Sequence, residues 1–220
     1  MAASQESLEA WEARFEAKVR ASGLGDDPAH DIGHIRRVVA SARRLALPEE
    51  ADLAVVLPAA WLHDLVNVPK NDPRRSSASR LSAEAAIDWL RSVGYEQAPL
   101  DHIAHAIEAH SYSANIECRT VEARVVQDAD RLDAIGAIGI ARTFAVAGQL
   151  GTSIHDIDDP FARERSLDDR SFAVDHFHVK LFGVAQTMKT QAGREEALRR
   201  AEFLRLYLAQ LGREIGAEPR

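Results

Sequence analysis

Apolar residues recur at intervals of three and four along nearly the whole chain of 220 residues, and no stretch sustains the alternation that is typical of a half-buried strand. Because a period of about 3.6 residues places these side chains on one face of a helix, the pattern predicts an all-α fold. Helices are expected over residues 5–21, 31–46, 49–66, 79–93, 98–110, 117–129, 131–147, 171–190 and 193–213.

Two prolines indicate where the predicted helix over residues 49–66 starts and where it bends. Pro48 is followed by "EEAD", and a proline at the first helical position with acidic residues behind it is typical of a helix start. Pro58 lies within the same helix and is expected to kink it just before His63. The segments 67–77 and 148–170 lack a helical pattern and are predicted to be surface loops, which often carry functional residues.

The composition limits the classes of partner. A chain with 46% hydrophobic and 28% charged residues is typical of a globular protein, and its length favours one domain over residues 1–220. The net charge of −7 argues against DNA, RNA or an anionic membrane as a stable partner. Cys118 is the single cysteine, so no intrachain disulfide is expected. The absence of a signal-peptide pattern and of a bilayer-length apolar stretch favours a cytoplasmic protein.

Side chains that can bind a metal concentrate in four stretches: "AHDIGHIRRV", "LHDLV", "AHAIEAHSYS" and "VVQDADRLDAIGAIGIAR". His30 and His34 are four residues apart and share a helix face, while His63 and Asp64 are adjacent and near enough to reach one ion. Imidazole and carboxylate ligands suit Mn²⁺, Fe²⁺, Ni²⁺, Zn²⁺ or, less well, Mg²⁺, and leave positions for water and substrate. Such an open site indicates catalysis.

The order of these motifs resembles the HD-domain phosphohydrolase superfamily, in which a histidine, an "HD" pair and a later "AD" each lie on a helix. Within it, the chain is most similar to the bacterial YedJ-like and YpgQ-like HD hydrolases through "HDIGHIRRV", "AAWLHD", "HSYS", "QDADRLDAIGAIGIAR" and "HFHVKLF". The resemblance covers residues 30–182 and implies a single HD domain, with the C-terminal helices over 183–216 packing on that core. It also implies one divalent metal ion bound by His34, His63, Asp64 and Asp130.

The last ligand is a choice among the three aspartates of "QDADRLDA". Related HD enzymes carry this ligand in an "AD" followed by one residue and then an apolar one, which selects Asp130 over Asp128 and Asp133. On a helix, Asp128 would point about 200° away from Asp130, so the two are not expected to bind the same ion directly.

A divalent ion in such a site would lower the pKa of its bound water and polarise a phosphoryl oxygen. The predicted site therefore favours phosphoester hydrolysis. Asp64 is then a catalytic residue as well as a ligand. His30 is a candidate proton donor for the leaving oxygen, and the alternative is a histidine that caps the preceding turn. Only one of His105 and His110 is expected to reach the site, and the "HSYS" motif favours His110. Its role is left open between phosphate contact, support of a ligand and a second metal ion.

A basic segment, residues 70–80, follows the HD pair in this otherwise acidic chain. Its cations are expected to bind substrate phosphates, because guanidinium and ammonium groups neutralise phosphate oxygens. They are Lys70, Arg74, Arg75 and Arg80. The alternative is a solvated loop in which Ser79 or Ser82 caps the next helix. By resemblance, Lys180 is also assigned to the substrate pocket, against the alternative of an exposed lysine.

The stretch "GAIGIAR", residues 136–142, is not interpreted as a nucleotide-binding loop, because no strand precedes it. Gly136 and Gly139 are expected to let helices approach closely. Arg142 is expected either to pair with an acid such as Asp128 or Asp133 or to reach substrate.

Together these features predict a metal-dependent phosphohydrolase that acts on nucleotides or related phosphorylated small molecules. Cleavage is expected either at an inner anhydride of a nucleoside triphosphate, as in a nucleoside triphosphate pyrophosphohydrolase, or at a terminal monoester. The alternatives are a guanosine tetraphosphate hydrolase and a non-catalytic nucleotide-binding HD module. Residues 194–216 form an amphipathic stretch that packs either internally or across a homodimer.

Overall fold

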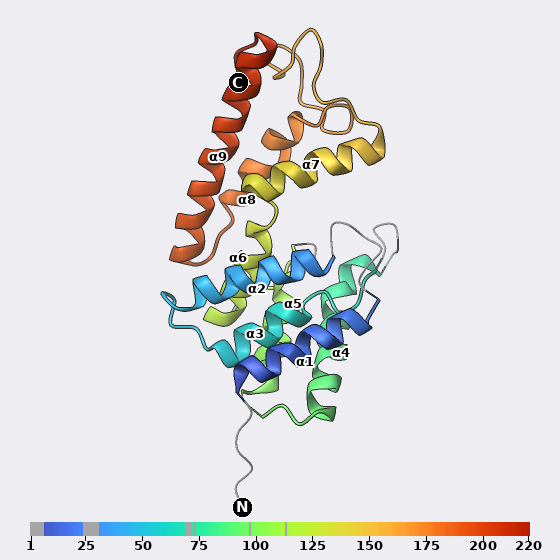
Figure 1. Cartoon of the computed structure of the whole chain (residues 1–220), viewed down its shortest axis with the longest axis vertical. Helices are drawn as coiled ribbons and strands as arrows, with labels where there is room; N and C mark the ends of the chain where they lie inside the picture. Colours follow the sequence, from blue (N-terminus) through green and yellow to red (C-terminus); the bar gives the residue numbers. More distant parts are fainter. Residues whose placement is uncertain (1–6, 24–30, 69–71, 73, 97, 113) are drawn as a thin grey trace, which may run out of the picture. The chain divides into compact units, whose positions relative to one another are not determined.

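A computed structural model of the chain describes residues 7–23, 31–68, 72, 74–96, 98–112 and 114–220. The described residues form helices and no strand, with one isolated bridge between Ser153 and Phe172, which confirms the predicted all-α fold. The chain divides into two compact units, Met1–Asp130 and Arg131–Arg220 (Figure 1). The single domain over residues 1–220 stays a prediction. None of the described helices has the length and apolar character needed to cross a membrane.

The described part of the first unit contains six α-helices, and α3 is the one on which several of the others pack (Figure 1). They are α1 (Leu8–Ala21), α2 (Ile32–Ala46), α3 (Leu53–Leu62), α4 (Ala78–Ser92, preceded by the 3₁₀ turn Arg75–Ser77), α5 (Leu100–His110) and α6 (Val121–Leu132). α6 continues past the end of this unit by two residues. α1, α2 and α5 each pack against α3, and α4 packs against α5. The metal-binding motifs therefore meet around one buried helix.

α3 is apolar on every side, as expected of a helix enclosed by others. Its start corrects the prediction from Pro48: the helix begins at Leu53, because the side chain of Asp52 accepts a hydrogen bond from the Ala54 N–H over 2.8 Å. The helix passes through Pro58, which has no N–H to donate to the Ala54 carbonyl. Tyr95 supplies the missing donor, with its hydroxyl 2.6 Å from the Ala54 oxygen.

The second unit consists of α7 (Gly136–Leu150), a π-helical turn (Phe177–Leu181), α8 (Phe182–Ala185) and α9 (Gln191–Ile215), with α7 and α8 packed on α9. The predicted helix over residues 171–190 is too long, since the helical residues there are 175–185. A Cβ atom on Gly139 would lie 2.3 Å from the Ala134 carbonyl oxygen. Gly139 is therefore required by the tight turn that leads into α7, and not by the approach of another helix that the sequence predicted.

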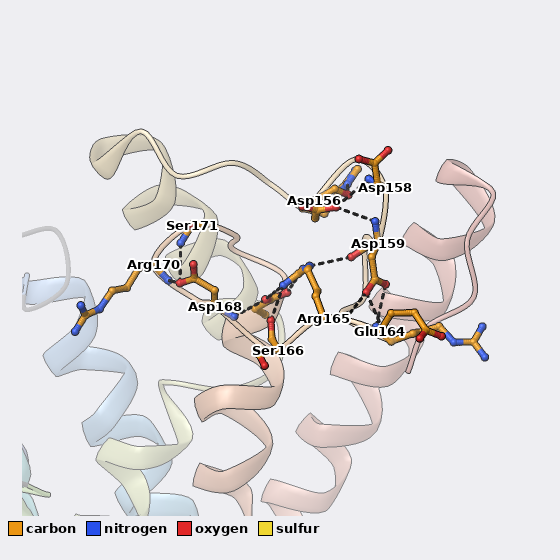
Figure 2. Close-up of polar contacts among 12 residues, drawn as sticks. Asp156, Asp158, Asp159, Glu164, Arg165, Ser166, Asp168, Arg170 and Ser171 are labelled. Carbon is orange, nitrogen blue, oxygen red and sulfur yellow. Dashed lines mark hydrogen bonds and ion pairs between the residues drawn. The ribbon is translucent and has the colours of Figure 1, made fainter.

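A long loop between α7 and the π-helical turn is held together by aspartates (Figure 2). Asp159 accepts hydrogen bonds from the backbone N–H groups of Arg163, Glu164 and Arg165 over 2.9 to 3.0 Å, and these bonds lower its pKa to about 2. Arg165 forms a two-pronged ion pair with the buried Asp175, with N–O distances of 2.5 and 2.9 Å. The predicted loop is confirmed, although α7 extends to Leu150 before the loop begins.

Candidate metal centre

His34 lies in the first turn of α2, where a helix cap fixes its backbone. The side chain of Asp31 accepts a hydrogen bond from the His34 N–H over 2.7 Å. The imidazole of His34 is buried, and its Nε2 atom lies 3.5 Å from Oδ1 of Asp130 and 3.9 Å from Oδ2 of Asp64. The cap thus holds the first histidine of the predicted site next to both predicted carboxylates.

His63 caps the C-terminus of α3 and is completely buried. Its Nδ1 atom is 2.9 Å from the carbonyl oxygen of Ala60. Because a carbonyl oxygen can only accept, Nδ1 carries the proton and the lone pair lies on Nε2. That Nε2 atom faces Asp64 Oδ2 at 3.5 Å and Asp130 Oδ1 at 3.9 Å, and it makes no hydrogen bond within the described part of the chain. His63 is therefore oriented as a metal ligand.

His110, the last residue of α5, joins the same group, whereas His105 does not. Nδ1 of His110 donates to the Ile107 carbonyl oxygen over 2.6 Å, and its Nε2 atom lies 3.6 Å from Oδ1 of Asp64. Nε2 of His105 instead accepts a hydrogen bond from the backbone N–H of Arg119 over 3.0 Å. We call His34, His63, Asp64, His110 and Asp130 the histidine–aspartate cluster.

The cluster has one buried and one open side. Its three histidines are buried, but the side chains of Asp64 and Asp130 are 26% and 27% exposed. Two overlapping sets of ligand atoms each lie within 4.8 Å of one another: His34, His63 and Asp130, and His63, Asp64 and His110. Neutral imidazole and carboxylate groups suit a divalent ion of the Mn²⁺, Fe²⁺ or Zn²⁺ type. The donors present thus fit a metal ion that is open to solvent on its carboxylate side.

The electrostatic environment differs between the two histidines nearest Asp64. Burial lowers the pKa of His63, which keeps its imidazole neutral and its Nε2 lone pair available. Burial also acts to lower the pKa of His110, but the contact with Asp64 and the negative charges of Asp64 and Asp130 outweigh it. The pKa of His110 is consequently raised.

Of the remaining predicted site residues, some lie outside the described residues and the others are exposed on the surface of their own unit. His30 and Lys70 are not described, nor is the side chain of Arg75. Arg74 pairs with Asp72 over 2.8 Å, and Arg80 is exposed near the start of α4. Lys180 is exposed on the π-helical turn of the second unit.

The other two aspartates of "QDADRLDA" are buried. Asp128 is completely buried on α6. Asp133 pairs with Arg142 over 2.9 Å. This ion pair is one of the two that were predicted for Arg142.

Sequence reasoning missed two residues that brace the backbone beside the cluster. Ser82 does not cap α4: its hydroxyl accepts a hydrogen bond from the N–H of Val66, just after the HD pair, over 3.1 Å. Ser79 makes no cap hydrogen bond either, since the N-cap position belongs to Ser77. Gln127 donates to the carbonyl oxygen of Ala109 over 2.6 Å. Serine and glutamine carry no spacing signal, so only the fold reveals these contacts.

Comparison with known proteins agrees with this geometry. The sequence model of the HD domain matches residues 31–135. The YpgQ protein of Bacillus subtilis is 34% identical over 194 residues, which is 86% of each chain. The crystal structure of that YpgQ in complex with ADP has a TM-score of 0.71 and 33% identity, covering 93% of this chain and 97% of that chain. A HD-superfamily hydrolase from Bacillus thuringiensis has a TM-score of 0.75 and 30% identity, with coverage of 96% and 100%. The chain therefore belongs to the HD-domain family.

Proposed function

We propose that this protein is a metal-dependent phosphohydrolase that acts on nucleotides or related phosphorylated small molecules. The observation that carries the proposal is the convergence of His34, His63, Asp64 and Asp130, which come from α2, the end of α3 and α6. Each of the two histidine Nε2 atoms lies 3.5 to 3.9 Å from an oxygen of both carboxylates, and the group is buried on the histidine side and partly exposed on the carboxylate side.

These four side chains would hold the ion. A divalent cation bound by them supplies a water of lowered pKa and polarises a phosphoryl oxygen. The hydrogen bond from His63 Nδ1 to the Ala60 carbonyl oxygen fixes the ring and leaves Nε2 toward the cluster. The buried histidines exclude bulk water from one side, so substrate approaches past Asp64 and Asp130.

His110 is the residue of this cluster that we assign to the substrate or to ligand support. Its Nε2 atom lies 3.6 Å from Asp64 Oδ1, where it would orient that carboxylate or contact a phosphate oxygen. We keep His30 as a candidate proton donor on its place in the sequence alone.

A nucleotide substrate is supported by the relative with a bound ligand, since YpgQ from Bacillus subtilis was crystallised in complex with ADP. The basic segment adds exposed cations at Arg74 and Arg80 that suit a chain of phosphates. Lys180 is kept as a substrate-binding candidate from the resemblance. Among nucleotide reactions, release of pyrophosphate from a nucleoside triphosphate is the specific form that we propose.

The test is a release assay with Mn²⁺ on nucleoside mono-, di- and triphosphates and on guanosine tetraphosphate, with phosphate and pyrophosphate measured separately. We expect metal-dependent pyrophosphate release from triphosphates that Asp64→Asn eliminates. Asp101→Asn, an exposed aspartate on α5, is the matched control and should retain full activity. Release from guanosine tetraphosphate alone would support the alarmone hydrolase. Nucleotide binding without release would contradict the enzyme and support a binding module.

A further inference from the structure

A buried hydrogen bond joins two of the helices that carry the histidine–aspartate cluster. Nε2 of Gln127 on α6 donates to the carbonyl oxygen of Ala109 on α5 over 2.6 Å. Gln127 is only 3% exposed, so water cannot take over the contact if the amide is removed.

Each end of this bond adjoins a member of the cluster. Ala109 directly precedes His110 at the end of α5, and Gln127 lies three residues before Asp130 on α6. Residues three apart on a helix lie on the same side, about 60° from one another. The bond therefore connects the backbone that carries His110 with the helix face that carries Asp130.

The buried amide of Gln127 costs free energy that an apolar side chain in its place would not. Oε1 of Gln127 is buried and makes no hydrogen bond within the described residues. A buried oxygen without a donor costs free energy, and an unbranched apolar side chain of similar length would avoid that cost while filling the same space. Polar groups retained at such a cost can serve to specify one arrangement of the elements they join.

We propose that Gln127 is a positioning residue, whose hydrogen bond to Ala109 fixes α5 and α6 so that His110 and Asp130 lie in register around a divalent cation. This inference rests on the proposed function, since it presupposes that the cluster binds a metal ion. Groups beyond the ligands typically change metal affinity by about 10- to 100-fold when they are removed.

The test compares the affinity for Mn²⁺ alone with thermal stability in the full chain. Gln127→Met keeps the length of the side chain and removes the donor. The matched control is Tyr95→Phe, which removes a buried hydrogen bond of the same 2.6 Å length, from the Tyr95 hydroxyl to the Ala54 carbonyl oxygen. Calorimetric titration well below each melting temperature gives the Kd of the folded protein for Mn²⁺. A loss of stability therefore does not by itself change the measured Kd.

We expect Gln127→Met to raise the Kd for Mn²⁺ by about tenfold or more, and Tyr95→Phe to leave it within about twofold of the wild type while it lowers the melting temperature. If Gln127→Met does not fold, Gln127→Asn, which keeps the amide but is one methylene too short for the contact, should show the same rise. An unchanged Kd in the folded Gln127 variant would overturn the positioning role alone. A wild-type protein that binds no Mn²⁺ would overturn the proposed function as well.

Discussion

Nε2 of His34, on α2, lies 3.5 Å from Oδ1 of Asp130, on α6. This separation is longer than a direct N–H···O hydrogen bond, which spans about 2.7 to 3.2 Å. It matches two ligands on one ion, since atoms that each lie about 2.1 Å from a metal are about 3.0 to 3.4 Å apart in octahedral or tetrahedral geometry. His63 Nε2 lies 3.5 Å from Oδ2 of Asp64 and 3.9 Å from Oδ1 of Asp130, again beyond the length of a direct hydrogen bond. These separations are compatible with side chains that bind one ion between them.

Removing a ligand should abolish turnover and spare the fold. Asp64 is partly exposed, so Asp64→Ala should leave the free energy of unfolding nearly unchanged. His63→Ala also loses the hydrogen bond to Ala60 and should cost about 1 to 2 kcal/mol. Nucleotide hydrolysis and urea unfolding measured on the same samples check both points. A variant that folds and retains wild-type turnover would show that its side chain is not a ligand.

The basic segment should affect substrate binding more than chemistry. Changing both Arg74 and Arg75 to alanine should raise the KM for triphosphates on the order of tenfold, because charged contacts to phosphate are lost, and leave kcat nearly unchanged. Arg91→Ala, at the other end of α4, removes an exposed arginine of the same kind and should leave KM unaltered. Equal KM values in the double variant and the wild type would show that the basic segment is a solvated loop that does not bind substrate.

Two buried serines on α4 provide a matched pair for the turn after the HD motif. Ser82→Ala leaves the Val66 N–H without its acceptor and should lower the free energy of unfolding by about 1 to 3 kcal/mol. Ser79 is equally buried, but its hydroxyl makes no hydrogen bond in the described part of the chain. Ser79→Ala should therefore be neutral or slightly stabilising. Urea denaturation distinguishes the two, and equal losses would argue against a bracing role for Ser82.

The ion pair between Arg165 and Asp175 should dominate the stability of the long loop in the second unit. Asp175 is 1% exposed, so Arg165→Ala leaves a buried charge without its cation and should cost about 3 to 5 kcal/mol. The exposed pair of Arg205 and Glu202 is the control, and Arg205→Ala should cost less than about 1 kcal/mol. Thermal unfolding of both variants measures the difference. A similar small loss in both would contradict a structural role for the buried pair.

Local sequence signals predicted several helices closely and misplaced the bounds of two others. α2 was expected over residues 31–46 and spans Ile32–Ala46, because Asp31 is a strong cap in front of a periodic apolar pattern. α3 was expected to start at Pro48, but the Ala54 N–H donates to the side chain of Asp52 and the helix begins at Leu53. The π-helical turn after residue 176 has no distinct sequence pattern, and the helical segment there is shorter than the predicted 171–190.

The adjacency of His63 and Asp64 predicted that both could reach one ion. Their meeting with His34 and Asp130 could be predicted only through resemblance, because these residues are far apart in sequence. The choice of His110 over His105 came from the "HSYS" motif, and the structure places His110 beside Asp64. Ser82 and Gln127 could not be found in this way. Their hydrogen bonds reach the backbone of distant segments, and the partner is defined only after the helices have packed.

An anomalous difference map from crystals of the protein grown with Mn²⁺ tests the proposed metal site most directly. We expect one strong peak within about 2.0 to 2.4 Å of His34 Nε2, His63 Nε2 and carboxylate oxygens of Asp64 and Asp130. No peak among these four side chains, or a Mn²⁺ ion bound elsewhere while they remain uncoordinated, would contradict it.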